Sequence, residues 1–196
     1  MRFRLGLTGS IGMGKSTTAR LFAEAGCDVW DADAAVHRLY AQGGAAVGPM
    51  GDAFPDAIVD GAVSRDALKQ IIGNDAGALK QIEAIVHPLV AEDRAEFVEN
   101  ARSDILVFDI PLLFETGGNE RMDAVTVVSV DAETQRQRVM DRGTMTEAQF
   151  ETILAKQVPD AEKRAKADYV IVTDTLDHAK SQVLEVIADI RGKMHA

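Results

Sequence analysis

Near its start the chain reads Gly9-Ser10-Ile11-Gly12-Met13-Gly14-Lys15-Ser16, and this run decides the fold. It has the form G-x-x-x-x-G-K-S, the phosphate-binding loop that joins a β-strand to an α-helix in proteins that bind nucleoside triphosphates. The flanking sequence agrees, because residues 2–8 are typical of a short strand and residues 15–25 predict a helix that Gly26 ends. The run therefore predicts a triphosphate site rather than an ordinary glycine-rich turn.

The residue types of this loop fit the chemistry of phosphate binding. Its glycines let backbone N–H groups approach phosphate oxygens, and the following helix adds the positive end of its dipole. Lys15 reaches the β- and γ-phosphates, the Ser16 hydroxyl is placed to bind Mg²⁺, and Thr17 can contact the α-phosphate. The predicted nucleotide contacts are therefore Gly9, Gly12, Met13, Gly14, Lys15, Ser16 and Thr17.

Further strands are predicted where short apolar runs stand between helical patterns. These runs are residues 27–30, 105–108, 124–130 and 169–172. The last predicted helix carries Leu176, Ala179, Val183, Val186, Ile187 and Ile190 on one face, which is the spacing of a helix that packs on a sheet. Strands that alternate with helices indicate an α/β fold with a parallel sheet.

Two stretches stand apart from this alternation. Residues 43–62 are rich in Gly, Pro and Asp and predict a loop-rich connection. They precede helical patterns at 65–72 and 75–99, and Pro88 is expected to interrupt the second. Residues 135–166 are polar, charged and helical in character. We expect one domain with inserted helical parts.

Composition and charge exclude some classes of protein. The 196 residues are 46% hydrophobic and 27% charged, which suits one soluble globular domain. No apolar run is long enough to span a bilayer, and no export signal is found, so the cytoplasm is the expected location and no membrane partner is expected. The net charge of −10 argues against a nucleic-acid partner, and the single Cys27 against a disulfide framework.

Three aspartates follow predicted strands, where the chemistry of such sheets gathers. Asp31 and Asp33 follow residues 27–30, and Asp109 ends the run 105–108. Asp33 can orient or deprotonate an attacking hydroxyl, and Asp109 can be a metal-site carboxylate like that of a Walker-B strand. The alternative is that these aspartates cap the helices that follow.

Arginines in the charged stretch are candidates for contact with the transferred phosphate. Arg136, Arg138 and Arg142 lie there, as in segments that close over the nucleotide of small phosphotransferases and exclude water. The alternative is a solvated helix with i,i+4 charge pairs. No cluster of His, Cys and Asp has metal-ligand spacing.

The loop alone leaves several classes of nucleotide-binding protein open. A GTPase would carry an Asn-Lys-x-Asp element and an Asp-x-x-Gly switch, and the sequence has neither. The chain is short for a motor or transporter ATPase. Size, inserted helices and an arginine-bearing segment favour a small-molecule kinase, whose acceptor could be a nucleoside or a sugar acid. The alternative from a different class is a nucleotide-dependent regulatory or scaffold protein without turnover of its own.

Over nearly its whole length the sequence resembles the dephospho-coenzyme A kinases. The resemblance rests on residues 7–17, Asp31-Ala32-Asp33, Arg65-Asp66-Ala67-Leu68, His87-Pro88-Leu89, Pro111-Leu112-Leu113-Phe114-Glu115, Gln137-Arg138 with Arg142, and Ala167-Asp168-Tyr169-Val170-Ile171. The run at 111–115 and the His-Pro dipeptide discriminate the family best. The resemblance implies transfer of the ATP γ-phosphate to the ribose 3′-hydroxyl of dephospho-coenzyme A, with Mg²⁺, in the last step of coenzyme A synthesis.

The resemblance also implies how the chain is divided. It predicts a single parallel-sheet P-loop kinase domain, like the nucleoside monophosphate kinases, whose core comprises about 1–33, 101–134 and 167–196. It makes about 34–100 the helical acceptor-binding lobe and about 135–166 the helical lid.

Residue roles follow from the same resemblance. Asp33 would be the base or orienter of the acceptor hydroxyl, with Lys15 and Arg142 also catalytic, and Arg138 and Arg142 would contact the phosphates. The expected acceptor contacts are Asp33, His37, Arg65, His87 and Leu113. The sequence departs from the family at Thr173-Asp174, where many members carry Asn and a small residue near the adenine, and at Arg142-Gly143-Thr144, where Asn often follows the arginine.

Overall fold

The computed structural model describes residues 2–195. By its internal contacts the chain divides into two compact units, which we call the core unit (Met1–Trp30 with Ala101–Ala196) and the helical unit (Asp31–Asn100). The helical unit spans nearly the residues of the predicted acceptor lobe, whereas the predicted lid at 135–166 belongs to the core unit. No helix among residues 2–195 is both long enough and apolar enough to cross a bilayer.

The core unit is built on a five-stranded sheet in the order β2-β5-β1-β6-β7. The strands are β1 (Phe3–Thr8), β2 (Asp28–Asp31), β5 (Ile105–Asp109), β6 (Ala124–Ser129) and β7 (Tyr169–Val172). Central β1 pairs in parallel with β5 and β6, and β6 pairs in parallel with β7. The predicted α/β fold with a parallel sheet is confirmed, and each predicted strand is present.

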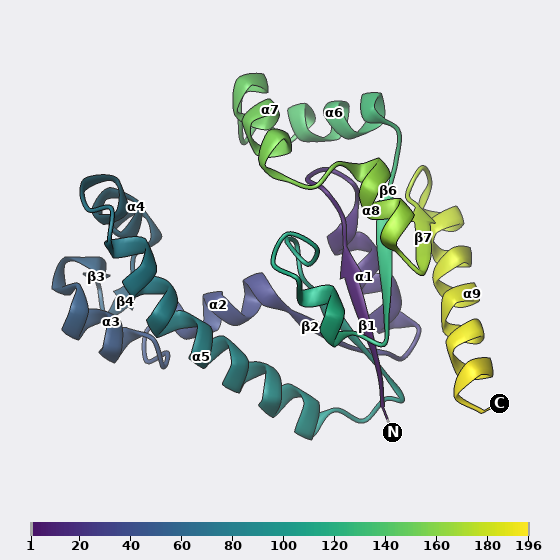
Figure 1. Cartoon of the computed structure of the whole chain (residues 1–196), viewed down its shortest axis with the longest axis horizontal. Coiled ribbons are helices and arrows are strands. Elements are labelled where there is room, and N and C mark those ends of the chain that lie inside the picture. Colours follow the sequence, from purple (N-terminus) through teal and green to yellow (C-terminus); the bar gives the residue numbers. More distant parts are fainter. Residues whose placement is uncertain (1, 196) are drawn as a thin grey trace. The chain divides into compact units, whose positions relative to one another are not determined.

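Helices α1 (Lys15–Glu24) and α9 (Leu176–Met194) contact each other and cover one face of this sheet (Figure 1). Leu5, Leu7, Val107 and Ile171 point into the cluster that they share. The opposite face carries a smaller cluster formed by Leu113, Val125 and Val127. Because successive residues of a strand point to opposite faces, one strand such as β6 supplies both clusters, and the sheet is buried on both sides.

The charged segment, residues 135–166, is helical as its composition predicts, but it is divided into three helices. These are α6 (Ala132–Asp141), α7 (Glu147–Lys156) and α8 (Asp160–Lys166). Asp131 caps α6 through the N–H of Thr134 at 2.9 Å, and Thr146 forms a capping box with Gln149 at the start of α7. Gly143, at φ 62°, allows the turn that separates α6 from α7.

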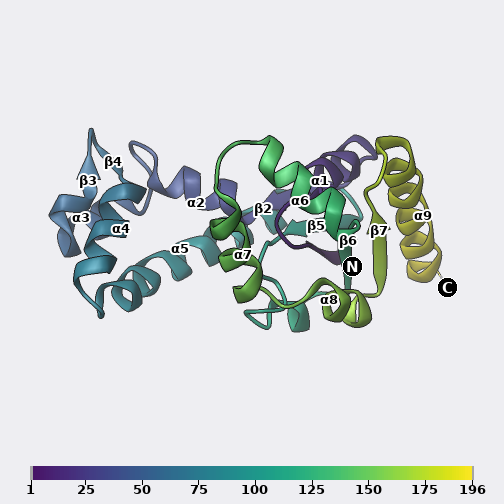
Figure 2. The same cartoon turned by 90° about the horizontal axis from the view of Figure 1, so that it is seen from above.

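The helical unit comprises α2 (Ala32–Tyr40), α3 (Val47–Ala53), the short 3₁₀ helix η1 (Pro55–Ala57), β3 (Ile58–Val59), β4 (Ala62–Val63), α4 (Arg65–Asn74) and α5 (Ala78–Asn100). Figure 2 shows α3, α4 and the β3–β4 hairpin gathered around one end of α5, with α2 alongside it. Met50, Leu68, Ile82 and Val86 form much of the apolar core of this unit.

Two predictions for this unit were wrong. Residues 43–62 are not mainly loop, because α3 buries Met50 and Asp60-Gly61 forms a two-residue hairpin turn with φ 50° and 76°. Positive φ at both turn residues is the type I′ geometry that Asp-Gly favours. Pro88 does not end the helix either, since it lies exposed within α5. The apolar packing of Ile82 and Val86, which lie on the same helix, compensates for the backbone hydrogen bond that is lost at the proline.

Candidate active site

The phosphate loop passes from the end of β1 to the first turn of α1, as the sequence predicts. Gly12 and Gly14 lie in left-handed backbone conformations, with φ 78° and 89°. A Cβ atom on Gly12 would lie 2.6 Å from Cγ2 of Val139, and one on Gly14 would lie 3.0 Å from Oγ1 of Thr173. The loop is therefore enclosed by distant parts of the chain, and neither position tolerates a side chain without movement.

Side chains from the charged segment hold the loop from outside. Gln135 donates from Nε2 to the carbonyl oxygen of Ile11 at 2.7 Å, and the Ile11 N–H donates to Oε1 of Gln157 at 3.3 Å. The Val130 N–H donates to the sulfur of Met13 at 3.2 Å. Sequence reasoning placed Ile11 and Met13 in the loop but missed their partners Gln135, Gln157 and Val130, because a single side-chain amide or main-chain N–H far along the chain leaves no periodic pattern.

The first turn of α1 has the features of an anion site. Its N-cap is Gly14, which offers no side-chain acceptor, and the turn contains no acidic residue. The N–H groups at the start of the helix therefore keep their capacity to bind phosphate oxygens. Ser16 and Thr17 are exposed at this end, while Thr18 is buried and donates to the carbonyl oxygen of Gly14 at 3.1 Å.

Lys15 and Asp109 form an ion pair beside the loop. Asp109 is the last residue of β5 and lies opposite Leu7 of β1, so two adjacent parallel strands bring the pair together. The Asp109 side chain is 1% exposed and that of Lys15 is 16% exposed. A buried carboxylate next to the ammonium group fixes the position of Lys15 and balances its charge.

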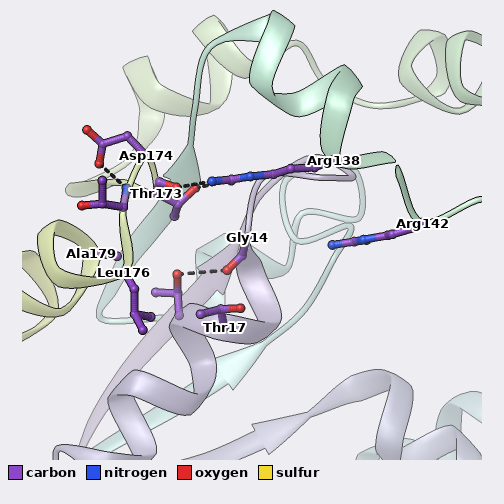
Figure 3. Close-up of a pocket in the computed structure, with 10 residues that line it drawn as sticks. Gly14, Thr17, Arg138, Arg142, Thr173, Asp174, Leu176 and Ala179 are labelled. Atoms are coloured by element: carbon purple, nitrogen blue, oxygen red, sulfur yellow. Dashed lines mark hydrogen bonds between the residues drawn. The ribbon is translucent and has the colours of Figure 1, made fainter. Parts of the chain in front are cut away.

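A cavity of about 280 Å³ lies next to the loop (Figure 3). Its lining comes from the loop and α1, from α6, and from the segment after β7: Gly14, Thr17, Thr18, Arg138, Arg142, Thr173, Asp174, Thr175, Leu176 and Ala179. The lining includes Gly14 and Thr17 from the start of α1, Arg138 from α6 and Arg142 from its C-cap, and the uncharged residues Thr175, Leu176 and Ala179. A site for a nucleoside that carries phosphates has this division.

The three candidate arginines have different surroundings. Arg138 donates from Nη1 to Oγ1 of Thr173 at 3.0 Å and from Nη2 to the Thr173 carbonyl oxygen, and it lines the cavity. Arg142 follows α6 and also lines the cavity, although it is exposed. Arg136 instead pairs on the surface with Glu147 of α7, so it is solvated as in the alternative, but its partner lies on another helix and not four residues away.

Asp174 lies on the rim of the same cavity. Its Oδ1 accepts hydrogen bonds from Nδ1 of His178 at 2.7 Å and from the N–H of Thr175 at 2.8 Å. These bonds, that of His178 first, hold the pKa of Asp174 below its ordinary value. The group is therefore a carboxylate at neutral pH, and its position four residues before His178 is the sequence signal for this pairing that the sequence analysis did not use.

The segment after β5 is anchored to the end of the charged segment. Thr8 donates to the carbonyl oxygen of Pro111 at 3.1 Å, and Leu113 is fully buried. Glu115 pairs with the fully buried Lys163 of α8 at 2.9 Å and accepts the N–H of Val158 at 2.9 Å. The run at 111–115 thus has a structural role, and the expected contact of Leu113 with an acceptor stays a prediction.

The remaining predicted acceptor residues all belong to the helical unit. Asp33 and His37 are exposed one helical turn apart on α2, and Asp31, not Asp33, caps this helix by accepting the Ala34 N–H at 2.9 Å. Arg65 begins α4, with its guanidinium carbon 5.6 Å from the centre of the Tyr40 ring. His87 is exposed on α5. Their contacts with substrates stay predictions.

Nothing in the described part of the chain forms a cluster of three or more His, Cys, Asp or Glu side chains able to hold a metal ion. A cation at this site would therefore take few protein ligands, as Mg²⁺ does in phosphate-transfer sites, where water and phosphate oxygens complete its shell. Of the two predicted metal residues, Ser16 is exposed in the first turn of α1 and Asp109 is 1% exposed next to Lys15, and their binding of a metal ion stays a prediction.

Comparison with known proteins gives one consistent family. The family model described as dephospho-CoA kinase (CoaE) matches residues 3–178. The dephospho-CoA kinase of Ruegeria pomeroyi is 69% identical over 197 residues, covering 100% of both chains, and that of Cereibacter sphaeroides is 60% identical over 96% of each.

Solved structures agree in fold with these relatives. A Thermus thermophilus protein has a TM-score of 0.85 at 31% identity and covers 96% of this chain and 97% of its own. The dephospho-CoA kinase of Campylobacter jejuni has a TM-score of 0.70 at 26% identity, covering 98% and 100%. A shikimate kinase from Acinetobacter baumannii, at 16% identity and a TM-score of 0.55, shares the fold alone and covers 98% and 95%.

Proposed function

Because the chain belongs to the dephospho-CoA kinase family, we propose that its own residues divide the work of that reaction between a donor site in the core unit and an acceptor site in the helical unit. The protein is an ATP-dependent kinase that transfers the γ-phosphate of ATP to the ribose 3′-hydroxyl of dephospho-CoA, the last step of coenzyme A biosynthesis. The observation that carries this function is the 69% identity along the full chain.

The donor site consists of the phosphate loop and the cavity beside it. Main-chain N–H groups at the start of α1 bind the phosphates, because the N-cap Gly14 offers no competing side-chain acceptor. The N–H groups of Ile11 and Met13 are not among them, since they donate to Gln157 and Ser10. Lys15, held by Asp109, neutralises charge on the β- and γ-phosphates. Arg142 adds a second positive charge from the end of α6.

The residues present fit a magnesium ion. Ser16 and Asp109 would hold it, since both supply oxygen atoms next to the loop. When bound, such an ion supplies charge neutralisation to the phosphates. The protein's own part is to place the Ser16 hydroxyl at the first turn of α1 and to keep the Asp109 carboxylate buried beside Lys15.

The acceptor site is proposed to lie in the helical unit. Asp33 orients the ribose 3′-hydroxyl and accepts its proton as the oxygen attacks, and its exposed place on α2 leaves the carboxylate available. His37, Arg65, His87 and Leu113 are proposed as further residues that bind the acceptor. Residues 135–166 would act as the lid, because they supply both Arg138 and Arg142 and enclose the loop.

We further propose that the enzyme works in the cytoplasm, on small molecules and without a nucleic-acid partner. Support comes from the net charge of −10 and from Cys27, which is a free, buried cysteine. Burial raises the pKa of the Cys27 thiol to about 11, so the thiol stays protonated and unreactive.

One assay tests the function directly. Purified protein is incubated with ATP, Mg²⁺ and one acceptor at a time, and both ADP and the phosphorylated product are measured. We expect ADP and coenzyme A to form in equal amounts with dephospho-CoA, and little ADP with shikimate, gluconate or nucleosides.

Two other results would overturn the proposal. ADP formation only with a nucleoside or a sugar acid would indicate a kinase of another acceptor. Tight ATP binding without turnover on any acceptor would indicate a regulatory nucleotide-binding protein.

A further inference from the structure

Thr173 is a buried polar residue at the point where three parts of the core unit meet. It directly follows β7, is 7% exposed, and its N–H donates to the carbonyl oxygen of Ser129 at 2.9 Å, so its backbone is fixed to the sheet. Its hydroxyl donates to the carbonyl oxygen of Met13 in the phosphate loop at 2.7 Å. The same hydroxyl accepts a hydrogen bond from Nη1 of Arg138 at 3.0 Å.

The guanidinium group of Arg138 is held at two points by this one residue. Nη1 donates to the Thr173 hydroxyl and Nη2 to the Thr173 carbonyl oxygen, as Figure 3 shows for the side chains around the cavity. Two parallel donors on one planar group fix its orientation as well as its position. Arg138 therefore lines the cavity as a fixed planar wall.

The side chain of Thr173 also shapes the loop by contact. A Cβ atom on Gly14 would lie 3.0 Å from its Oγ1, 3.1 Å from its Cβ and 3.3 Å from its Cγ2. Thr173 thus packs directly over Gly14, the N-cap residue of α1. Both its hydroxyl and its methyl group face functional parts of the site, and their effects can be separated by substitution.

We propose that Thr173 is a positioning residue for the donor nucleotide, because its single hydroxyl ties the Arg138 wall of the cavity to the backbone of the phosphate loop. The inference rests on the proposed function, in which this cavity takes the nucleoside of ATP. Both Nη atoms of Arg138 donate to Thr173, so we assign its planar guanidinium group to stacking on the nucleobase rather than to the phosphates, which the loop and Arg142 bind. Thr173 therefore sets the distance between the two ends of the nucleotide site.

The test compares Thr173→Val, which keeps the shape and removes the hydroxyl, with Thr173→Ser, which keeps the hydroxyl. In Thr173→Val the Met13 carbonyl loses its donor and Arg138 loses one of two acceptors. Because each lost buried partner weakens the site, we expect the KM for ATP to rise about 10-fold to 100-fold. The KM for dephospho-CoA should change less than about 2-fold and kcat less than about 5-fold, since the change acts on ATP binding. Thr173→Ser should restore most of the ATP affinity.

Thr116→Val is the matched control, because Thr116 lies outside the proposed lid and its exposed hydroxyl donates to the carbonyl of Leu112, four residues before it, at 2.8 Å. ATP affinity is also measured by calorimetry, and Arg138→Met is combined with Thr173→Val. If Thr173 acts through Arg138, the double variant should lose little more affinity than Arg138→Met alone.

Three results would overturn the inference: an unchanged KM for ATP in Thr173→Val, an equal loss in the Val and Ser variants, or normal ATP affinity in Arg138→Met. The last applies even if Thr173→Val does not fold. A wild-type protein that binds ATP but does not phosphorylate dephospho-CoA would contradict the proposed function, and the calorimetric comparison would still decide the role of Thr173.

Discussion

The buried ion pair between Glu115 and Lys163 gives a quantitative prediction for Lys163→Met. Lys163 is fully buried and Glu115 is 14% exposed, with 2.9 Å between Nζ and Oε1. Removing one partner of a buried pair leaves the other charge uncompensated and typically costs about 3–5 kcal/mol. We expect the lower end, about 3 kcal/mol, because Glu115 keeps the N–H of Val158 and some contact with water. For a chain of this length that is a fall in melting temperature of about 6–12 °C.

The stability that Lys163→Met loses should depend on pH in a defined direction. Burial raises the pKa of the Glu115 carboxyl group, but hydrogen bonds from Lys163 and from the Val158 N–H outweigh burial and hold the pKa below its ordinary 4.5. A carboxylate with a lowered pKa in the folded state stabilises the fold above its unfolded pKa, and this stabilisation is lost as pH falls through the folded value. The difference between wild type and Lys163→Met should therefore be largest near pH 7 and shrink below about pH 4.5.

The assay is thermal and urea unfolding followed by circular dichroism at several pH values. Arg20→Met is the control, because the Arg20–Glu24 pair is exposed (66% and 57%) and such pairs contribute about 0–1 kcal/mol. Adding Glu115→Gln to Lys163→Met removes the second charge, keeps an acceptor for Val158, and should recover part of the loss. Unchanged stability in Lys163→Met, or a loss that does not vary with pH, would refute the reasoning.

Further predictions concern the loop, the catalytic carboxylate and the long helix. Gly12→Ala should lower ATP affinity about 10-fold or more, because its φ of 78° disfavours a side chain and Val139 lies 2.6 Å from the new atom. The control is Gly192→Ala, which has open space around it, and both affinities are measured by calorimetry. Equal ATP affinities in the two variants would contradict this prediction. Asp33→Asn should lower kcat roughly 10²–10⁴-fold with ATP affinity retained, and unchanged turnover in steady-state kinetics would remove Asp33 from catalysis. Pro88→Ala should raise stability by up to about 3 kcal/mol, because it restores a helical N–H at an exposed site; a lower melting temperature would show that the proline is required.

The sheet and the phosphate loop were predictable because local patterns determine them. Runs such as 105–108 and 169–172 are apolar enough to be buried on both faces, and glycines at fixed spacing identify the loop. The hairpin at 58–63 was missed although its signal was present, because Asp60-Gly61 stands in a stretch whose other Gly and Pro residues suggested a loop. The overall composition of residues 43–62 was given more weight than the Asp60-Gly61 dipeptide, which predicts a hairpin turn.

The side chains that hold the loop were not predictable from local sequence. Gln135 lies 124 residues from its partner Ile11, and Thr173 lies 160 residues from Met13. Such contacts depend on how the chain folds back on itself and leave no periodic pattern. Lys163 was hidden for another reason, since a lysine in a charged helix normally lies in solvent. The site residues of the helical unit, Asp33 among them, remain predictions.

Met13 occupies a position that the motif G-x-x-x-x-G-K-S leaves open to any residue, yet three of its atoms are engaged. Its N–H donates to the Ser10 carbonyl at 3.2 Å, its carbonyl accepts from Thr173, and its sulfur accepts the Val130 N–H. The eight-residue loop is therefore not a portable module. A chimera that received the loop of another kinase would carry over the motif, but the main-chain N–H of Val130 would lose its sulfur acceptor unless the new loop also had methionine at this position.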